Sequence, residues 1–241
     1  MRRLLPGPPA ELDPFDAYRD QPAQWLRIGM VASVDGSVTD QELWTDGLGG
    51  EPDRRVFRAL RAVCDGILVG ATTIRTGRVG PHRLAAGLRA RRTAIGKPDP
   101  APVIVVSRSL RLDWSHRLFT EATTPTVVVT CAAAMPGWPA AAAARPLVAG
   151  DAEVDLAGAI RRLRTELGLS QLLCEGGPAL ATGLLAGGLV DELCLTVAPT
   201  LIGARHHTRM LGELDRRRDL TLTALYEDSG VLTVRYQPGP T

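Results

Sequence analysis

The sequence has few aromatic residues, almost no net charge and no closely spaced cysteines. Aromatic residues make up 4% of the 241 residues, and the formal net charge is +2. Single-stranded nucleic acids are bound by stacking platforms and basic surfaces, so we expect no nucleic-acid partner. The four cysteines, Cys64, Cys131, Cys174 and Cys194, form no C-x-x-C pair. A structural zinc site is therefore not expected, and each cysteine is interpreted as a small core residue.

Long hydrophobic runs are also missing, and none is long enough to span a bilayer. Arg2 and Arg3 near the N-terminus are followed by Pro6, Pro8 and Pro9 rather than by the apolar centre of a signal peptide. The sequence thus predicts a cytoplasmic protein without a membrane partner. The G-x-G-x-x-G pattern of common dinucleotide-binding folds does not follow the first predicted strand.

Alternating apolar strands and amphipathic helices are what the sequence does contain. Strands are predicted at residues 25–33, 66–70, 102–107, 126–130, 171–174 and 191–198, and helices at 52–64, 155–167 and 179–185. Residues 220–227 and 231–236 are typical of an antiparallel hairpin. We expect an irregular arm at 1–24 and a loop at 76–100, whereas the Ala-rich segment 140–144 has high helix propensity. This order predicts an α/β fold with a mostly parallel sheet flanked by helices, and a single domain over 25–241.

A glycine turn lies between the predicted strand 171–174 and the following helix. Its residues are Glu175, Gly176, Gly177 and Pro178, and the helix continues with Ala179 and Leu180. Glycine lets the backbone approach a ligand closely, and free N–H groups of a first helical turn attract anions. The carboxyl edge of a parallel sheet is also where ligands bind. The turn is therefore a candidate phosphate site, with an ordinary tight turn as the alternative.

Two further strand ends carry groups that could bind a phosphate. One strand leaves through Gly70 and is followed by the hydroxyls of Thr72 and Thr73. Another ends at Ser107 and Arg108, and arginine binds phosphate bidentately, so this pair could contact the 2′-phosphate of NADPH. The alternatives are that Thr72 caps a short helix and that Arg108 is a solvated surface charge. Three such ends on one sheet edge favour a cofactor site.

Taken in order, the motifs resemble those of a known family. They are Val31-Ala32-Ser33-Val34-Asp35-Gly36, Val69-Gly70-Ala71-Thr72-Thr73, Glu175-Gly176-Gly177-Pro178-Ala179-Leu180 and Gly188-Leu189-Val190-Asp191-Glu192-Leu193. The chain, from about Leu26 to Gly203, resembles the reductase domain of riboflavin biosynthesis enzymes. These are pyrimidine reductases with a dihydrofolate-reductase-like fold.

The resemblance implies a cofactor, a substrate and an assembly. It implies that NADPH contacts Trp44, Thr73, Ser107 and the turn beginning at Gly177. It further implies that Arg61 and Glu175 bind a small-molecule substrate. Asp35 lies near the expected nicotinamide position, so Asp35 and Glu175 are the catalytic candidates, although an Asp-Gly pair also simply forms turns. A homodimer is implied, with residues 193–198 and the final hairpin at its interface.

The chain departs from the family pattern in one loop. Where such reductases have an acidic Asp-Asp-Pro segment, this chain has Gly77, with Arg78 and Arg83 as possible phosphate ligands. The H-x-E and P-C-x-x-C motifs of a companion deaminase are absent. His82, His116, His206 and His207 fall in predicted loops, where we expect them to be solvated.

The function expected from this resemblance is NADPH-dependent reduction of 5-amino-6-(5-phosphoribosylamino)uracil at the sugar C1 to a ribityl chain. Dihydrofolate reduction is an alternative within the same fold. A catalytically silent NADP-binding protein is an alternative from another class, and the substituted loop at Gly77 motivates it.

Overall fold

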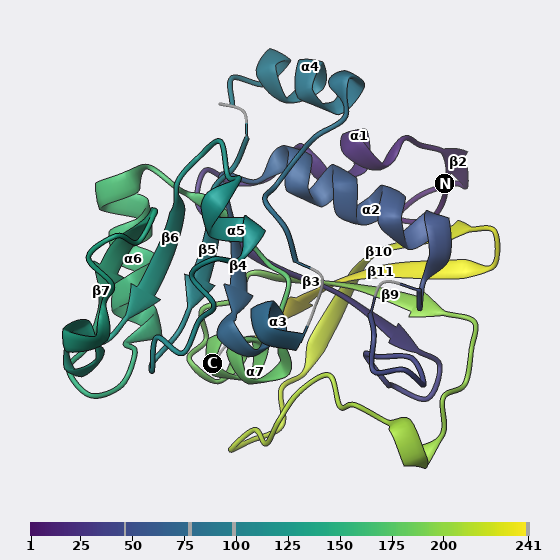
Figure 1. Ribbon diagram of the computed structural model, residues 1–241. Helices are drawn as coiled ribbons and strands as arrows, with labels where there is room; N and C mark the ends of the chain where they lie inside the picture. Colours follow the sequence, from purple (N-terminus) through teal and green to yellow (C-terminus); the bar gives the residue numbers. More distant parts are fainter. Residues whose placement is uncertain (46, 77–78, 98–99, 240–241) are drawn as a thin grey trace.

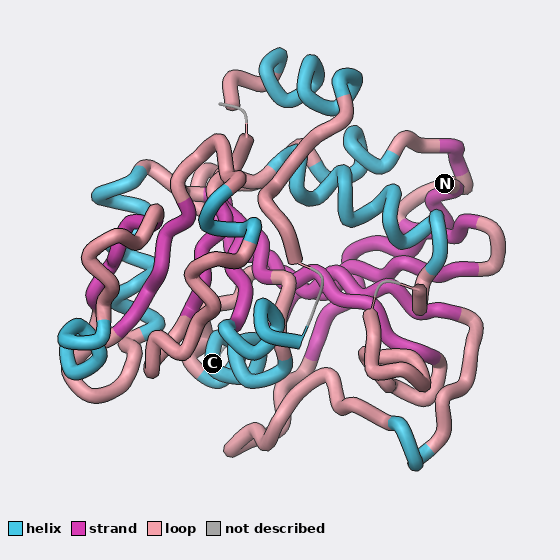
Figure 2. Tube along the Cα trace, in the orientation of Figure 1, coloured by secondary structure: helices cyan, strands magenta, loops and turns pink. Residues whose placement is uncertain are grey.

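Eleven strands of the described residues form a single sheet. The computed structural model describes residues 1–45, 47–76, 79–97 and 100–239. The strand order is β2-β1-β10-β11-β9-β3-β8-β4-β5-β6-β7, and Figure 2 shows the strands as one twisted band through the molecule. The strands are β1 (Arg2–Leu5), β2 (Ala10–Glu11), β3 (Trp25–Ser33), β4 (Gly66–Gly70), β5 (Val103–Val106), β6 (Thr126–Thr130), β7 (Ala144–Val148), β8 (Gln171–Cys174), β9 (Glu192–Ala198), β10 (Leu220–Asp228) and β11 (Val231–Pro238).

The helices cover both faces of this sheet. They are α1 (Pro14–Tyr18), α2 (Gly50–Val63), α3 (Ala71–Thr76), α4 (Ala86–Ala94), α5 (Arg117–Thr120), α6 (Leu156–Leu167) and α7 (Pro178–Ala186), with short 3-10 turns η1 (Ala132–Gly137) and η2 (Ala204–His206). In Figure 1, α1 and α2 lie together over one face, and α4 lies beyond them. The predicted α/β architecture is therefore confirmed.

The strand directions match the prediction of a mostly parallel sheet with a terminal hairpin. From β9 through β3, β8, β4, β5 and β6 to β7, each neighbouring pair is parallel. Strands β10 and β11 pair antiparallel, and β11 joins the parallel part through β9. The order places β8 between β3 and β4, although it follows both in the chain. The glycine turn after β8 therefore lies at the centre of the sheet edge.

Two apolar cores form because successive strand residues face opposite sides. In β4, Ile67 and Val69 pack with α2 in one core, whereas Leu68 packs with α6 and α7 in the other. Helix α6 ends at the predicted residue and begins one residue after the predicted start, with Asp155 as its N-cap. The side chain of Asp155 accepts a hydrogen bond from Gly158 N at 2.9 Å, and Gly168 ends the helix with a φ of +67°.

The expectation of an irregular N-terminal arm is wrong. Strand β1 pairs antiparallel with β10 and extends the sheet beyond the terminal hairpin. Helix α1 begins at Pro14, and the side chain of Asp13 caps it by accepting a hydrogen bond from Phe15 N at 2.9 Å. Phe15 and Tyr18 are buried in the same core as α2. The polar composition of residues 1–24 hid this element, because Phe15 and Tyr18 are too few to give an apolar pattern.

Regular structure also occurs in two other places where it was not expected. Helix α4 lies within the predicted loop 76–100 and is held by Arg92, which is buried and donates to the carbonyl of Ala62 at 2.9 Å. The Ala-rich segment leads into the edge strand β7 rather than forming a helix. None of the helices in the described ranges has the length and apolarity needed to cross a membrane.

Candidate active site

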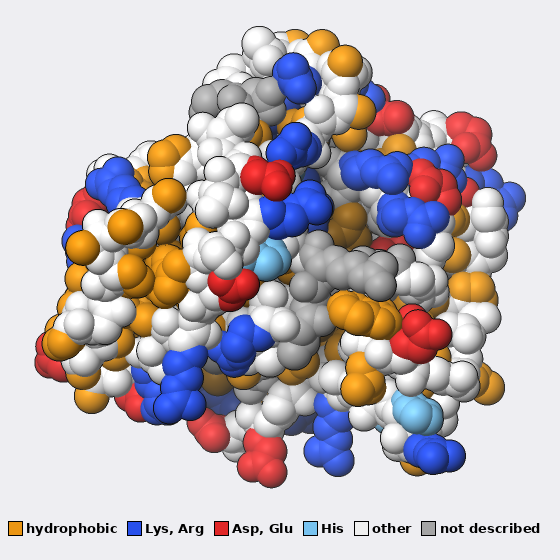
Figure 3. Space-filling model, in the orientation of Figure 1, with side chains coloured by type: hydrophobic (Ala, Val, Ile, Leu, Met, Phe, Trp, Pro, Cys, Tyr) orange, Lys and Arg blue, Asp and Glu red, His pale blue; other side chains and the backbone are white. Residues whose placement is uncertain are grey.

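A cleft of about 1290 Å³ opens at the carboxyl ends of the central strands. Its walls include residues at the ends of β4, β5 and β8, residues of α2, and the segment that follows β3. Figure 3 shows the hollow, with basic side chains gathered around it. Small-ligand pockets usually measure about 300–1,000 Å³, so this cleft has room for a cofactor and a substrate together.

The glycine turn after β8 packs tightly against the end of β4. The backbone N–H of Gly70 donates to the carbonyl of Gly176 at 2.8 Å, and Glu175 N donates to Leu68 O at 3.0 Å. A Cβ atom at Gly177 would lie only 2.9 Å from the Thr73 hydroxyl oxygen. No side chain fits there without moving Thr73. The turn therefore presents bare backbone to the cleft beside the first residues of α7.

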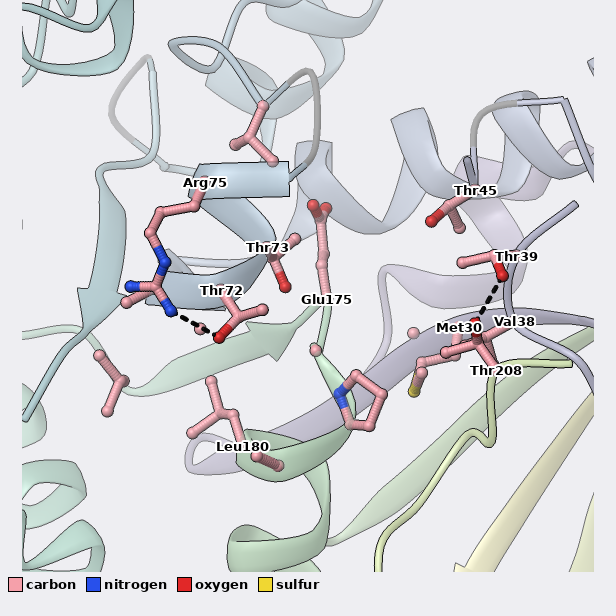
Figure 4. Close-up of a pocket in the computed structure, with 18 of the residues that line it drawn as sticks. Met30, Val38, Thr39, Thr45, Thr72, Thr73, Arg75, Glu175, Leu180 and Thr208 are labelled. Atoms are coloured by element: carbon pink, nitrogen blue, oxygen red, sulfur yellow. Dashed lines mark hydrogen bonds between the residues drawn. The ribbon is translucent and has the colours of Figure 1, made fainter. Parts of the chain in front are cut away.

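The structure brings together almost all of the residues predicted to bind the cofactor. The cleft is lined by Trp44, Gly70, Thr72, Thr73, Ser107, Arg108, Gly177, Pro178, Ala179 and Leu180. Gly176 is not among the lining residues, and its contribution is the carbonyl that fixes Gly70. Figure 4 shows Thr72 and Thr73 on α3 facing Leu180 on α7.

Several of these polar groups already have partners within the protein. The Thr72 hydroxyl accepts from Arg75 at 2.9 Å, and the Ser107 hydroxyl accepts from Leu110 N at 3.1 Å. Arg108 forms an exposed ion pair with Glu153 at 2.5 Å. Because both residues of this pair line the cleft, Glu153 competes with any anion that binds Arg108 there.

The two predicted substrate residues form one bidentate ion pair. Arg61 comes from the last turn of α2 and Glu175 from the end of β8. The Arg61 Nε and NH2 groups donate to the two Glu175 carboxylate oxygens at 2.5 and 2.6 Å. The Glu175 side chain is 7% exposed and points into the space between Thr73 and Thr45 (Figure 4). The pair therefore presents a positive and a negative group together in the cleft.

Asp35, the other catalytic candidate, lies outside the cleft lining. Its carboxylate accepts from the Ser33 hydroxyl at 2.5 Å and from Gly203 N at 2.7 Å. The Ser33 hydroxyl and the backbone amides of Gly203 and Ile202 lower the pKa of Asp35 to about 2. These contacts support the alternative interpretation, in which Asp35 holds its own turn against the segment after β9.

Of the two possible phosphate ligands of the altered loop, only Arg83 falls within the described residues. Arg83 is exposed, pairs with Glu121 at 3.1 Å and does not line the cleft. Gly77 and Arg78 lie outside the described residues. His82 is buried rather than solvated, and burial lowers its pKa to about 4. Its Nδ1 lies 3.2 Å from the carbonyl of Ala101, so His82 is a neutral core residue.

Several residues that were not among the sequence-predicted candidates also line the cleft, and the charged ones include Asp53, Arg54, Arg58, Arg75 and Arg117. Asp53 is only 8% exposed. Its position was visible as an acidic residue on the apolar stripe of α2, at helical spacing from Val56 and Leu60. Arg117 could not be found from the sequence, because only folding brings α5 next to Gly80. A Cβ atom at Gly80 would lie 2.9 Å from the Arg117 guanidinium.

Solved structures share this architecture. The structure of a pyrimidine reductase-like protein from Corynebacterium diphtheriae superposes with a TM-score of 0.80 at 24% identity, and the match covers 95% of this chain and 100% of that one. The fold is accordingly the α/β, dihydrofolate-reductase-like fold of pyrimidine reductases, as the resemblance implied.

The sequence comparisons then give the family. The model of the RibD C-terminal domain matches residues 24–234. Two curated relatives are each named 2,5-diamino-6-ribosylamino-4(3H)-pyrimidinone 5′-phosphate reductase. The one from Methanothermobacter thermautotrophicus is 33% identical over 185 residues, covering 75% of this chain and 80% of the relative. The one from Archaeoglobus fulgidus is 31% identical over 183 residues, covering 75% and 83%. The chain belongs to the RibD C-terminal domain family, which confirms the predicted membership of the pyrimidine reductases.

Proposed function

We propose that this protein is an NADPH-dependent reductase of a phosphoribosylamino-pyrimidine in riboflavin biosynthesis. The observation that supports this most directly is one cleft with a bare-backbone turn at Gly177 and a half-buried Arg61–Glu175 ion pair. The turn suits the phosphates of a dinucleotide, and the ion pair suits a polar substrate. We further propose that the protein acts in the cytoplasm. Residues 25–241 are proposed to form a single reductase domain.

The residues around the turn fit a nicotinamide dinucleotide. The backbone at Gly177 and the start of α7 would hold the phosphates, because a Cβ atom at Gly177 would fill that space. Arg108 would hold the 2′-phosphate in place of Glu153. The bound cofactor supplies the hydride that converts the sugar C1 of the substrate into the first carbon of a ribityl chain.

The charges of the cleft fit a phosphorylated substrate. Arg58 extends from α2 and Arg117 from α5, and both line the cleft. Arg58 is bridged to Glu51 at 2.7 Å on the exposed side of α2, so a phosphate that binds it competes with a solvated ion pair. The Arg61–Glu175 pair orients polar groups of the substrate within the cleft, because both side chains hold each other in one geometry.

Steady-state turnover tests this proposal. Purified protein is mixed with NADPH and either the phosphoribosylamino-pyrimidine or dihydrofolate, and NADPH oxidation is followed by absorbance. We expect oxidation with the phosphorylated pyrimidine. Turnover of dihydrofolate alone would support the alternative within the fold, and NADPH binding without turnover would support a catalytically silent protein.

The variant Arg61→Met tests whether Arg61 contributes to substrate binding. It leaves Glu175 without its partner in the cleft, so we expect kcat/KM to fall about 10- to 100-fold. Arg162→Met is the matched control, because Arg162 also forms an ion pair with a glutamate, Glu166 on α6, but outside the cleft lining. Equal effects of the two variants would argue against a substrate role for Arg61.

The proposed assembly is a homodimer that uses the terminal hairpin. Leu220, Leu222 and Leu232 are each about 40% exposed. Strand pairing places Leu222 opposite Tyr236. Leu232 is four residues from Tyr236 on β11 and therefore points to the same face of the sheet, so Leu222 and Leu232 share that face. An exposed apolar strip of this kind favours burial against a second copy. Strand β9 lies inside the sheet between β11 and β3, so the hairpin offers the larger exposed surface.

A further inference from the structure

Asp53 is a buried carboxylate in the wall of the cleft. It lies in the first turn of α2, and the helix backbone approaches the preceding loop very closely there. A Cβ atom at Gly49 would lie 2.4 Å from the Asp53 Cβ and 2.8 Å from its carboxyl carbon. Only glycine fits at position 49 beside this side chain. The glycine at position 49 therefore leaves room for the Asp53 carboxyl group in the wall of the cleft.

One oxygen of this carboxyl group has no partner within the described structure. Asp53 Oδ1 is buried and accepts no hydrogen bond. The hydroxyl of Thr196 on β9 is hydrogen-bonded to the carboxyl group, and Asp53 is one of the residues that line the cleft. Buried polar atoms in folded proteins nearly always have partners. An unpaired oxygen at a ligand cleft is where a ligand donor is expected.

The surroundings of Asp53 suit a flat heterocycle. Phe57 follows one turn later on the same face of α2, and Met30 lies on β3, and both line the cleft. An aromatic ring and a thioether provide apolar contacts for a planar ring. The charged neighbours of Asp53 are Arg54, which favours its ionised form, and Glu175, which disfavours it. Burial is the largest effect and raises the pKa of Asp53 to about 6. The group is then an acceptor at neutral pH.

We propose that Asp53 recognises the C2 edge of the pyrimidine and selects a 2-amino over a 2-oxo group. This inference rests on the proposed function, since it concerns the substrate of the same cleft. A 2-amino-4-pyrimidinone presents two neighbouring donors, the N3–H and the 2-amino group. An ionised carboxylate accepts at both oxygens and donates nothing, so it matches this edge. In a uracil the 2-oxo group places an acceptor opposite the carboxylate, which leaves two acceptors facing each other.

A binding experiment isolates the C2 position. The probes are 2,5,6-triaminopyrimidin-4-one and 5,6-diaminouracil, which differ at C2, titrated calorimetrically into protein saturated with NADP⁺ at pH 7.5. We expect the wild type to bind the 2-amino base about 10- to 100-fold more tightly, as for a hydrogen bond to a charged group. In Asp53→Asn the amide accepts from N3–H and donates to the 2-oxo group, so we expect the preference to disappear or reverse.

Glu51→Gln is the matched control. Glu51 is an exposed acid in the same first turn of α2, so its substitution removes the same charge from the same helix without touching the Asp53 side. We expect it to keep the wild-type preference. The wild-type pH dependence is a second test that needs no variant. Below about pH 6 Asp53 takes up a proton and the preference for the 2-amino base should shrink.

Three results would overturn this inference: no preference in the wild type, an unchanged preference in Asp53→Asn, or no binding of either base. Failure of the proposed function would look different. It would appear as the absence of NADPH oxidation with the phosphoribosylamino-pyrimidine, whereas the preference between the free bases is measured without turnover.

Discussion

Asp53 and Asp35 show how the surroundings of one residue type decide its role. Both are aspartates beside the β3 region, but the pKa of Asp35 is lowered to about 2 by the Ser33 hydroxyl and two backbone amides. The pKa of Asp53 is raised to about 6, chiefly by burial. The Asp35 carboxylate accepts its hydrogen bonds from groups of the protein, whereas one oxygen of the cleft residue Asp53 has no hydrogen-bond partner. Buried groups with raised pKa values occur more often at functional sites than elsewhere.

The raised pKa predicts that Asp53→Asn stabilises the protein. The folded chain holds the Asp53 proton up to about pH 6, but the unfolded chain releases it near 3.8. Stability therefore falls as the pH rises from 3.8 through 6, and the full cost is present above 6. About two pKa units correspond to an upper limit of roughly 3 kcal/mol, so we expect a gain of about 1–3 kcal/mol at pH 7.5.

Thermal unfolding of wild type and Asp53→Asn across pH 4–8 checks this prediction. The gain should be largest above pH 6 and should vanish near pH 4, where both side chains are neutral. Glu51→Gln provides the contrast. Hydrogen bonds from Arg54 and Arg58 lower the pKa of Glu51, so its neutralisation should not stabilise the protein. A destabilised Asp53→Asn would show that the buried carboxylate is paired after all.

At the scale of elements, the turn between β8 and α7 depends on the absence of side chains. Gly177 and Thr73 come from segments about a hundred residues apart, and a Cβ atom at Gly177 would contact the Thr73 hydroxyl at 2.9 Å. The carbonyl of Gly176 also fixes Gly70 at the end of β4. The proposed cofactor site is thus formed by the ends of two strands rather than by one sequence motif.

Gly177→Ala is expected to weaken cofactor binding. The added methyl group has to displace Thr73 or the turn, and shifts of about 1 Å cost roughly 100-fold in well-positioned sites, so we expect the Kd for NADPH to rise about 10- to 100-fold. Fluorescence titration with NADPH measures this change. Gly87→Ala is the control, because position 87 lies in α4 with nothing within 4 Å of the added Cβ. If both substitutions leave the Kd for NADPH unchanged, the turn is not part of the cofactor site.

Some elements could be predicted from the sequence and some could not. Strands β3, β4, β6 and β8 have the predicted bounds because continuous apolar runs bury both faces of a strand. Helix α4 was missed because its anchor, Arg92, is a charged residue that is buried only through the carbonyls at the end of α2. Strand β7 was missed because alanine favours a helix locally, whereas pairing with β6 decides the outcome.

At the scale of the whole molecule, strand order creates the site. Insertion of β8 between β3 and β4 places Glu175 beside Arg61 from α2, which are 114 residues apart. The same sheet continues from β3 through β9 to the terminal hairpin, which β11 and β10 form. The cleft and the proposed dimer surface are therefore parts of one continuous sheet.

The double variant Leu222→Asp and Leu232→Asp tests the proposed dimer. Two charges on the apolar strip of β10 and β11 should oppose association, so we expect a shift from dimer to monomer in light scattering after size exclusion. Leu201→Asp is the control, because Leu201 is 71% exposed and lies outside the strands. A monomeric wild-type protein, or a double variant that stays dimeric, would rule out this surface.

The sequence by itself determined the order of most strands and helices, the three strand ends whose residues line the cleft, and the family. These depend on local periodicity and on short motifs, which one stretch of chain carries whole. Only the tertiary structure decided that Arg61 pairs with Glu175, that the Asp35 carboxylate accepts from Ser33 and Gly203, and that Asp53 lines the cleft with one unpaired, buried oxygen. Burial and pairing depend on neighbours from distant segments, and those neighbours are fixed only when the sheet assembles.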